Sequence, residues 1–328
     1  MPFTRLSRPC LVLCLVAGGA SFVAACGSSH GTARSGSSRR LPAAARSIGL
    51  GRAIRLARLP APREKAAAAA LAGRIVVAGG LSPAGSSTAT VFAVKRSGAV
   101  RAVAPLVTPV HDAAAAATGG RVLLFGGGQA EGSDQIVQVQ PGRAHQVAHL
   151  PQPLSDLASA SIDGTTYLVG GWNGATPSTA VYRFRGDGAP TQVGRLPLGV
   201  RYPGAAAVVG RIVVAGGEDS TGNATSEVSV FDPRSGRSRQ VAALPAAVDH
   251  AAGVALAGRF YLVGGLRRGS PSDSVLSWTP GERRFVRAGR LPVPLADAAA
   301  VPFAGGIAVI GGRGPSGAAD SVLLLRPR

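Results

Sequence analysis

The segment Gly73-Arg-Ile-Val-Val-Ala-Gly-Gly80 joins a turn glycine, a short β-branched run and a glycine pair, and the sequence contains this arrangement six times. The six pairs are Gly79-Gly80, Gly126-Gly127, Gly170-Gly171, Gly216-Gly217, Gly264-Gly265 and Gly311-Gly312. Successive pairs are 44 to 48 residues apart. The glycines seven positions before the second member of each pair are Gly73, Gly120, Gly164, Gly210, Gly258 and Gly305. Such a regular period indicates a repeat architecture in which each repeat folds as one structural unit.

Each repeat has the pattern of four short strands. The β-branched run before the glycine pair predicts one strand, and a polar loop, an apolar strand, a turn and a last strand usually ending in Leu-Pro follow it. Small residues precede the turn glycine, as at 66–70 and 113–117. Alanine favours helix, but strands that crowd around a central axis accommodate only small side chains. We therefore expect these stretches to be innermost strands.

The fourth repeat resembles a known family. Residues 226–245 resemble the kelch repeat closely, and the fifth repeat has the family's spaced aromatic pair as Trp278 and Phe285, which we expect in the core. The departures from the family pattern are Thr191 and Ser238 in place of tryptophan, and Val94, Val139 and Leu325 in place of the first aromatic. The resemblance covers residues 49–328 and implies an all-β fold, a six-bladed β-propeller of kelch type.

The last blade lacks one strand. After Gly312 only 16 residues remain, which is enough for a third strand at 321–325 but not for a fourth. The segment 53–60 closely matches 285–292, the fourth strand of blade five. We predict that it completes blade six, which would remove two exposed sheet edges. This arrangement predicts that the chain enters the propeller at the outer rim between blades six and one.

The first residues have the pattern of a lipoprotein signal. Arg5 and Arg8 precede an apolar run at 11–25, which is too short for a membrane-spanning helix and typical of a secretory signal. The segment Val23-Ala-Ala-Cys26 resembles the lipobox of bacterial lipoproteins. We therefore expect a signal peptide at 1–25, lipidation of Cys26, a flexible Ser/Gly/Arg tether at 26–48 and a propeller at 49–328. The alternatives are an ordinary cleaved signal and an uncleaved anchor helix.

The charge is strongly basic, with 35 Lys and Arg against 16 Asp and Glu and a net charge of +19. The basic residues are scattered and lack interleaved aromatics, so we expect no specific nucleic-acid partner. The arginine and alanine excess is typical of a GC-rich genome, and the alternative is a surface selected to bind polyanions. An anionic cell-wall polymer is a weak partner that this charge favours.

Polar residues recur at the start of each innermost strand. The residues fifteen positions before the second glycine of each pair are Lys65, Asp112, Asp156, Tyr202, His250 and Asp297. In a four-stranded blade these positions and the loops after the glycine pairs share one face. We therefore predict a ring of polar groups around one mouth of the channel. The competing interpretation is that these strands start with polar residues simply because the channel mouth is exposed to water.

We predict a ligand site at this mouth, because convergent polar groups in a concavity are the usual form of a binding site. Its residues are the six above together with His111, Arg201 and Trp172. Arg201 and Tyr202 would form a stacking and anion-binding pair. Neighbouring strand residues alternate faces, so we expect neither His111 with Asp112 nor Asp249 with His250 to form a dyad. His111 with Asp156, and His250 with Asp297, are expected to be able to meet across blades.

Three function classes remain open. The first is an extracytoplasmic, membrane-anchored module that binds an envelope protein, a peptide or a glycan. The second is a sugar-processing enzyme, since the kelch resemblance extends to sialic acid mutarotases and copper oxidases. The oxidases need a mature cysteine crosslinked near copper, and all three cysteines lie within the first 26 residues. The third is a structural part of an envelope complex. We assign no catalytic residue, cofactor or metal ligand.

Overall fold

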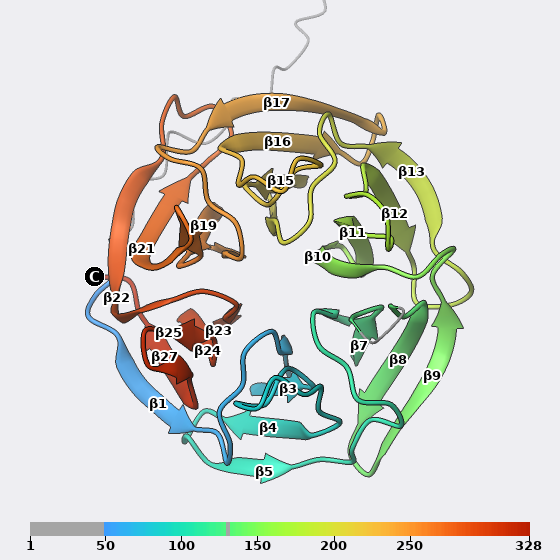
Figure 1. The fold of residues 1–328 in the computed structure, drawn as a ribbon, viewed down its shortest axis with the longest axis vertical. Helices are drawn as coiled ribbons and strands as arrows, with labels where there is room; N and C mark the ends of the chain where they lie inside the picture. The colour runs from blue at the N-terminus through green and yellow to red at the C-terminus, as the bar shows by residue number, and fades with distance from the viewer. Residues whose placement is uncertain (1–48, 129–131) are drawn as a thin grey trace, which may run out of the picture. The chain divides into compact units, whose positions relative to one another are not determined.

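The computed structural model describes residues 49–128 and 132–328, which form six large antiparallel sheets arranged radially around an axis, and one small two-stranded sheet (Figure 1). Blade one consists of β2 (Ala67–Leu71), β3 (Arg74–Ala78), β4 (Val91–Lys95) and β5 (Val100–Ala102). Blade two consists of β6 (Ala114–Thr118), β7 (Arg121–Phe125), β8 (Gln135–Gln140) and β9 (Arg143–His149). Blade three consists of β10 (Ser155–Ile162), β11 (Thr165–Trp172), β12 (Ala180–Phe184) and β13 (Thr191–Arg195).

The remaining blades repeat this order from the axis outward. Blade four consists of β14 (Gly204–Val208), β15 (Arg211–Ala215), β16 (Glu227–Asp232) and β17 (Arg237–Ala243). Blade five consists of β18 (Ala252–Leu256), β19 (Arg259–Val263), β21 (Ser270–Trp278) and β22 (Val286–Leu295), with the short β20 (Leu266–Arg267) paired to β21. Blade six consists of β23 (Ala299–Phe303), β24 (Gly306–Ile310), β27 (Ser321–Leu325) and β1 (Ile54–Arg58), and β25 (Arg313–Gly314) and β26 (Gly317–Ala318) pair beside it.

The six-bladed propeller predicted from the glycine repeat is confirmed. The alanine-rich stretches are the innermost strands, for example β2 and β6. Crowding at the axis explains their small side chains: a Cβ added to Gly253 of β18 would overlap the backbone of Ala205 in the neighbouring β14. Backbone packing between blades thus overrides the helix propensity of alanine.

The core consists of apolar clusters between neighbouring blades. In the cluster between blades four and five, Trp278 and Phe285 stack at 5.7 Å, and Trp278 is only 1% exposed. The indole Nε1 donates a hydrogen bond of 3.0 Å to the carbonyl of Glu282. The expected core role of the aromatic pair is therefore confirmed.

The N-terminal strand closes the ring. β1 pairs antiparallel with β27, with Ile54 opposite Leu324 and Arg58 opposite Ser321, and Figure 1 shows β1 as the outer strand of blade six. The predicted entry point is wrong. The amide of Leu50 donates to the carbonyl of Ala288 in β22 at 2.7 Å, so the chain enters beside blade five. Leu50 is 1% exposed because it fills the apolar cluster between blades five and six.

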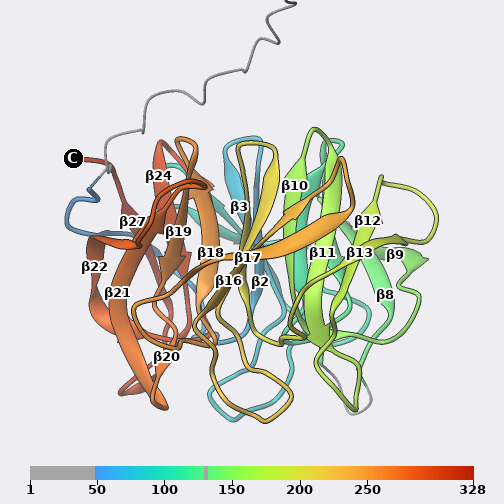
Figure 2. The same cartoon turned by 90° about the horizontal axis from the view of Figure 1, so that it is seen from above.

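The strands run between two faces of the propeller (Figure 2). We call the face with the glycine pairs and the loops after them the mouth face, and the face with the turns between the first two strands of each blade the hairpin face. β27 ends beside the β23–β24 turn, with Leu325 opposite Ile307. Because the amide of Arg328 donates to the carbonyl of Gly49 at 2.9 Å, both ends of the propeller lie on the hairpin face.

The predicted signal peptide, the lipid site Cys26 and the tether at 26–48 lie outside the described residues. Between residues 49 and 328, apart from 129–131, no helix is long and apolar enough to cross a membrane.

Candidate functional site

The residues predicted to surround the channel mouth do converge. Lys65, Asp112, Asp156, Tyr202, His250 and Asp297 all line one cavity of about 120 Å³, together with the small or apolar residues that follow them. All six have positive φ, between 51° and 59°. We call them the ring residues. A left-handed conformation costs a non-glycine residue on the order of 1–2 kcal/mol, so each blade keeps a side chain here at the expense of backbone strain.

A backbone hydrogen-bond ring stabilises these conformations. At five junctions within the described residues, the amide of one ring residue donates to the carbonyl of the ring residue on the adjacent blade, at 2.9–3.0 Å. At the junction between blades four and five, the rings of Tyr202 and His250 stack with centroids 3.8 Å apart. Backbone hydrogen bonds thus hold the ring residues of adjacent blades together around the mouth.

Lys65 reaches across the mouth. Its Nζ lies 3.0 Å from Asp112 Oδ2 and donates to the hydroxyl of Tyr202 at 3.1 Å, above the tyrosine ring. Burial opposes the charged ammonium, but Asp112, Tyr202 and Asp297 together outweigh it and raise the pKa of Lys65. Burial also raises the pKa of the Asp112 carboxyl, and Lys65 acts against this rise. Burial raises the pKa of Tyr202 to about 12, so its hydroxyl remains protonated.

Arg201 forms a second buried ion pair. Its Nε donates to Asp156 Oδ2 at 2.8 Å, its Nη2 donates to the hydroxyl of Tyr202 at 3.0 Å, and its guanidinium lies 4.7 Å from the centre of the Trp172 ring. The Asp156 side chain is only 2% exposed. The predicted stacking between Arg201 and Tyr202 is present, at 4.7 Å. Arg201 is already paired to a carboxylate, however, which leaves its guanidinium less available to an anionic ligand than predicted.

The predicted histidine pairs are partly wrong. Asp249 Oδ1 and His250 Nδ1 lie 3.1 Å apart, and His111 Nε2 lies 3.8 Å from Asp112 Oδ2. Strand alternation fails because the ring residues have left-handed backbone, which turns both side chains of a neighbouring pair toward the mouth. His250 Nε2 is 3.8 Å from Asp297 Oδ1, so this pair meets across blades but not at hydrogen-bond distance.

His111 is held by a neighbouring loop. Its Nδ1 shares a hydrogen bond of 2.8 Å with the hydroxyl of Ser87. Burial lowers the pKa of His111, and the charge of Lys65 lowers it further. The imidazole is therefore kept neutral at a mouth that contains several carboxylates, and it acts as a hydrogen-bonding group rather than a cation.

Three further side chains complete the mouth. Glu64 and Asp249 precede ring residues, and Arg313 follows the last glycine pair. Arg313 Nε lies 3.6 Å from Glu64 Oε2, and Arg313 Nη2 lies 3.8 Å from Asp297 Oδ2. No described residue donates a hydrogen bond to Glu64 Oε2, Asp249 Oδ1 or Asp297 Oδ2. An unsatisfied buried acceptor costs about 1–3 kcal/mol. On this side of the mouth, hydrogen bonds from the described residues therefore do not offset the cost of burying these carboxylate oxygens.

The mouth is acidic although the protein is basic. Its carboxylates are Glu64, Asp112, Asp156, Glu218, Asp249 and Asp297, six of the 16 in the chain, and its cations are Lys65, Arg201 and Arg313. Carboxyl groups at the mouth thus outnumber Lys and Arg side chains by six to three, which disfavours anionic ligands there, whereas the protein as a whole is strongly basic.

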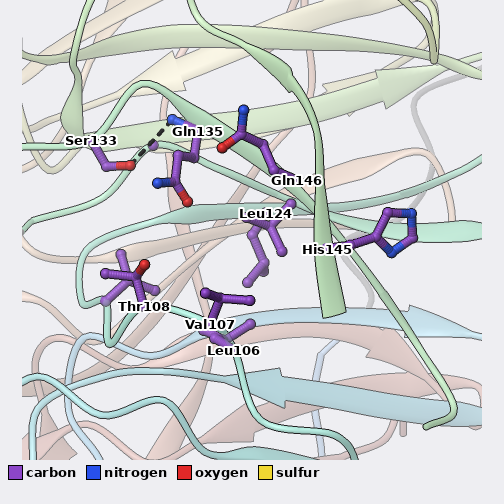
Figure 3. Close-up of a pocket in the computed structure, with 11 residues that line it drawn as sticks. Leu106, Val107, Thr108, Leu124, Ser133, Gln135, His145 and Gln146 are labelled. Atoms are coloured by element: carbon purple, nitrogen blue, oxygen red, sulfur yellow. Dashed lines mark hydrogen bonds between the residues drawn. The ribbon is translucent and has the colours of Figure 1, made fainter. Parts of the chain in front are cut away.

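A second cavity lies between the outer strands of blade two and the connection from blade one. It has a volume of about 130 Å³ and includes Val107, Leu124 and His145 in its lining. Figure 3 shows the aliphatic side chains together, Ser133 and Gln135 joined by a hydrogen bond, and His145 at one side. Among the described residues that line it, His145 is the one ionisable side chain, so these residues include no pair of groups suited to acid–base chemistry.

Comparison with known proteins agrees with the propeller fold. The kelch motif model matches residues 200–245, which include Arg201 and Tyr202. The fold is a six-bladed β-propeller of kelch type. The solved structure entitled "Structure of YjhT" superposes with a TM-score of 0.71 and 16% identity, covering 83% of this chain and 97% of that one. A search of curated proteins finds no sequence match.

The kelch repeat explains which site residues could be found from the sequence. The ring positions are at a constant distance from the glycine pairs, so counting locates them. Glu64, Asp249 and Arg313 stand directly before a ring residue or after a glycine pair, and backbone bridges such as Ala296 with Arg313 place these positions at the mouth. Their constant spacing was a usable signal, but it does not show which of them contact a ring residue.

Proposed function

We propose that this kelch propeller is an extracytoplasmic binding module, anchored to a membrane by a lipid on Cys26, which receives a projecting group of a partner at its mouth. The observation that supports the proposal is the cavity lined by all six ring residues. Backbone strain persists where surrounding structure enforces it, and it clusters at functional sites. A ring that only faced water could use glycine at these positions without strain.

The cavity size favours part of a partner over a whole small molecule. Pockets that enclose drug-sized ligands have volumes of about 300–1,000 Å³, whereas the mouth cavity has about 120 Å³. Its volume fits a side chain, a chain end or one substituent of a glycan. Trp172 and Arg201 stand beside the cavity, and tryptophan and arginine are frequent anchors at interfaces. The partner is therefore expected to be an envelope protein, a peptide or a glycan that inserts one group.

The double substitution Trp172→Ala and Arg201→Ala is expected to reduce partner capture at least tenfold, because loss of one anchor typically costs 1.4 kcal/mol or more, which is about tenfold. The measurement is a pull-down from envelope extract with residues 49–328 as bait. Arg74→Ala, on the exposed hairpin face, is the matched control. A thermal melt checks that each bait is folded. Equal capture by the wild-type and doubly substituted baits would exclude the mouth as the binding site.

Lipid anchoring is the second part of this proposal. Residue 49, where the described propeller begins, lies on the hairpin face, opposite the mouth. Cys26→Ser is expected to move the protein from the membrane fraction to the soluble fraction, because two or more acyl chains hold a protein stably and none would remain. Fractionation followed by immunoblotting measures the change. Retention of the variant in the membrane fraction would contradict the proposed anchor.

A sugar-processing enzyme related to the kelch-type sialic acid mutarotases is the second candidate. It is favoured by Asp112, whose pKa burial raises, beside the buried Asp156 held by Arg201, because two carboxyl groups in different environments can act as acid and base. The acidic mouth argues against an anionic sugar. Measurement of anomer exchange by NMR, with Asp112→Asn as control, separates this candidate from a binding module.

A structural role in an envelope complex is the third candidate. Val107, which lines the second cavity, is 84% exposed, and exposed apolar side chains can mark contact surfaces. The basic surface outside the mouth would suit an anionic cell-wall polymer. Partners that are captured equally by wild-type bait and by the Trp172/Arg201 variant would point to these surfaces.

A further inference from the structure

We infer that the mouth contains a cation subsite between Glu64 and Asp297, that its ligand is an ammonium or guanidinium group on a short stem, and that Arg313 occupies it as a displaceable internal substitute. The inference rests on the proposed binding function and specifies the chemistry of its ligand. It begins with an asymmetry in the mouth. Asp112 of blade two and Asp156 of blade three accept hydrogen bonds from Lys65 and Arg201, whereas Glu64 of blade one and Asp297 of blade six are approached by Arg313 only at 3.6 and 3.8 Å.

The compensated half consists of two tight ion pairs. Lys65 Nζ lies 3.0 Å from Asp112 Oδ2, and Arg201 Nε donates to Asp156 Oδ2 at 2.8 Å. Both cations also contact Tyr202. The hydrogen bonds of the Lys65 ammonium thus go to residues of blades two and four. A ligand cation entering this half would have to displace a buried pair, which disfavours this half as the subsite.

The other half of the mouth contains the carboxylates of Glu64, Asp249 and Asp297. The Arg313 guanidinium lies 3.6 Å or more from two of them. The Asp297 side chain is 2% exposed and lines the cavity, and no described residue forms a hydrogen bond with its Oδ2. Glu64 Oε2 and Asp249 Oδ1 likewise accept no hydrogen bond from the residues described, although Asp249 Oδ1 lies 3.1 Å from His250 Nδ1. Buried carboxylate oxygens are normally satisfied by donors. A buried, unpartnered carboxylate that lines a cavity points to a ligand with donors of its own.

Arg313 shows which kind of group fits. Its guanidinium lies between the carboxylates of Glu64 and Asp297, at 3.6 and 3.8 Å, close enough for attraction but too far for hydrogen bonds. Its side chain is 48% exposed. Its backbone is fixed, because its amide donates to the carbonyl of Ala296 at 2.7 Å. The side chain can therefore swing into solvent without disturbing the ring, and a ligand with better reach can replace it.

Chemistry narrows the ligand to a nitrogen cation. Among residues 49–128 and 132–328, no three His, Cys, Asp or Glu side chains are arranged to hold a metal ion. An ammonium or guanidinium supplies N–H donors for both carboxylates. The stacked rings of Tyr202 and His250 form an adjoining wall, on which an aliphatic stem can pack. A cavity of about 120 Å³ holds a cationic head with a few carbons.

The test is a titration of the full chain, solubilised in detergent, with n-butylammonium at constant ionic strength, followed by ligand-observed NMR. Arg313→Ala is expected to bind at least tenfold more tightly than the wild type, because the internal competitor is gone. Adding Asp297→Asn to Arg313→Ala is expected to weaken binding at least tenfold. Tetramethylammonium, which has the charge but no N–H, is expected to bind at least tenfold more weakly than butylammonium.

Whether Arg313→Ala strengthens butylammonium binding decides if the site binds a cation. If Arg313 instead binds an anionic ligand, Arg313→Ala will weaken acetate binding and leave butylammonium unbound, which overturns the inference. If the Asp297→Asn variant does not fold, Glu64→Gln in the Arg313→Ala background provides the same test from the other carboxylate. Equal butylammonium binding by Arg313→Ala with and without the carboxylate substitution would also overturn it.

Two further experiments identify the source of the cation and distinguish failure of the cation subsite from failure of the binding module. Lysine amide and glucosamine compare an amino-acid side chain with an amino sugar, and tighter binding of one assigns the source. Butylammonium binding without any mouth-dependent partner capture would reject the binding module and keep the subsite. Mouth-dependent capture without any amine binding would reject the subsite alone.

Discussion

Removal of residues 1–59 is expected to destabilise the propeller by on the order of 5 kcal/mol, because it deletes the outer strand of blade six. Leu59 is 3% exposed and belongs to the cluster between blades six and one. β1 also covers the edge of β27 along the register from Ile54 to Arg58. Without it, β27 becomes an open edge next to a partly exposed core, and open edges promote association.

The matched control for this deletion is a chain that begins at residue 49 and retains β1. It is expected to unfold at the same temperature as the full chain, because Leu50 and β1 keep their contacts. Calorimetry measures the difference in melting temperature, and size-exclusion chromatography measures association. If the chain that begins at residue 60 were monomeric and melted with the control, the N-terminal strand would not stabilise the ring.

The parts of the fold that were predictable from the sequence are those in which a residue type is required by the backbone. Glycine pairs with positive φ, spaced 44 to 48 residues apart, locate the second strand of every blade. The same count locates the ring residues, because each repeat begins its innermost strand at the same distance from the pair. The match of 53–60 to a fourth strand located β1 for the same reason.

The orientations of the side chains at the mouth were not predictable in this way. Strand alternation assumes extended backbone, and His250 has a φ of 53°, so Asp249 and His250 lie together instead of on opposite faces. The entry point was missed because Leu50 packs against blade five through contacts that no repeat encodes. Repeat spacing determines positions around the axis, whereas pairing within the mouth depends on side chains that differ from blade to blade.

The charge of the mouth was likewise not predictable from the sequence. The net charge of +19 suggested an anionic partner, and summed charge does not show where the acidic residues lie. The propeller brings Glu64, Asp249 and Asp297, which are more than 200 residues apart at the extremes, to one side of the mouth. The net charge of the whole sequence is thus positive, whereas the mouth is acidic. For this reason the proposed ligand class rests on the geometry of the mouth and not on the composition.

Gly216→Ala is expected to have the largest effect of any single substitution in blade four, on the order of 4 kcal/mol or more, since it combines backbone strain with an overlap that cannot relax. Gly216 has a φ of +66°, and a Cβ there would overlap the carbonyl oxygen of Val248. That carbonyl accepts the amide of Gly217 at 2.9 Å and is therefore held in place. Relief would require separation of blades four and five.

Gly210→Ala in the same blade is the matched control for Gly216→Ala. Gly210 has a φ of +71°, but no described atom lies within 4 Å of the added Cβ, so the substitution is expected to cost only about 1 kcal/mol of conformational strain. Chemical unfolding of both variants separates the strain from the overlap. A similar loss of stability in both would mean that positive φ alone explains the glycine pairs. A much larger loss for Gly216→Ala would mean that the pairs are needed because adjacent blades approach each other through their backbones, which is the contact that also aligns the ring residues.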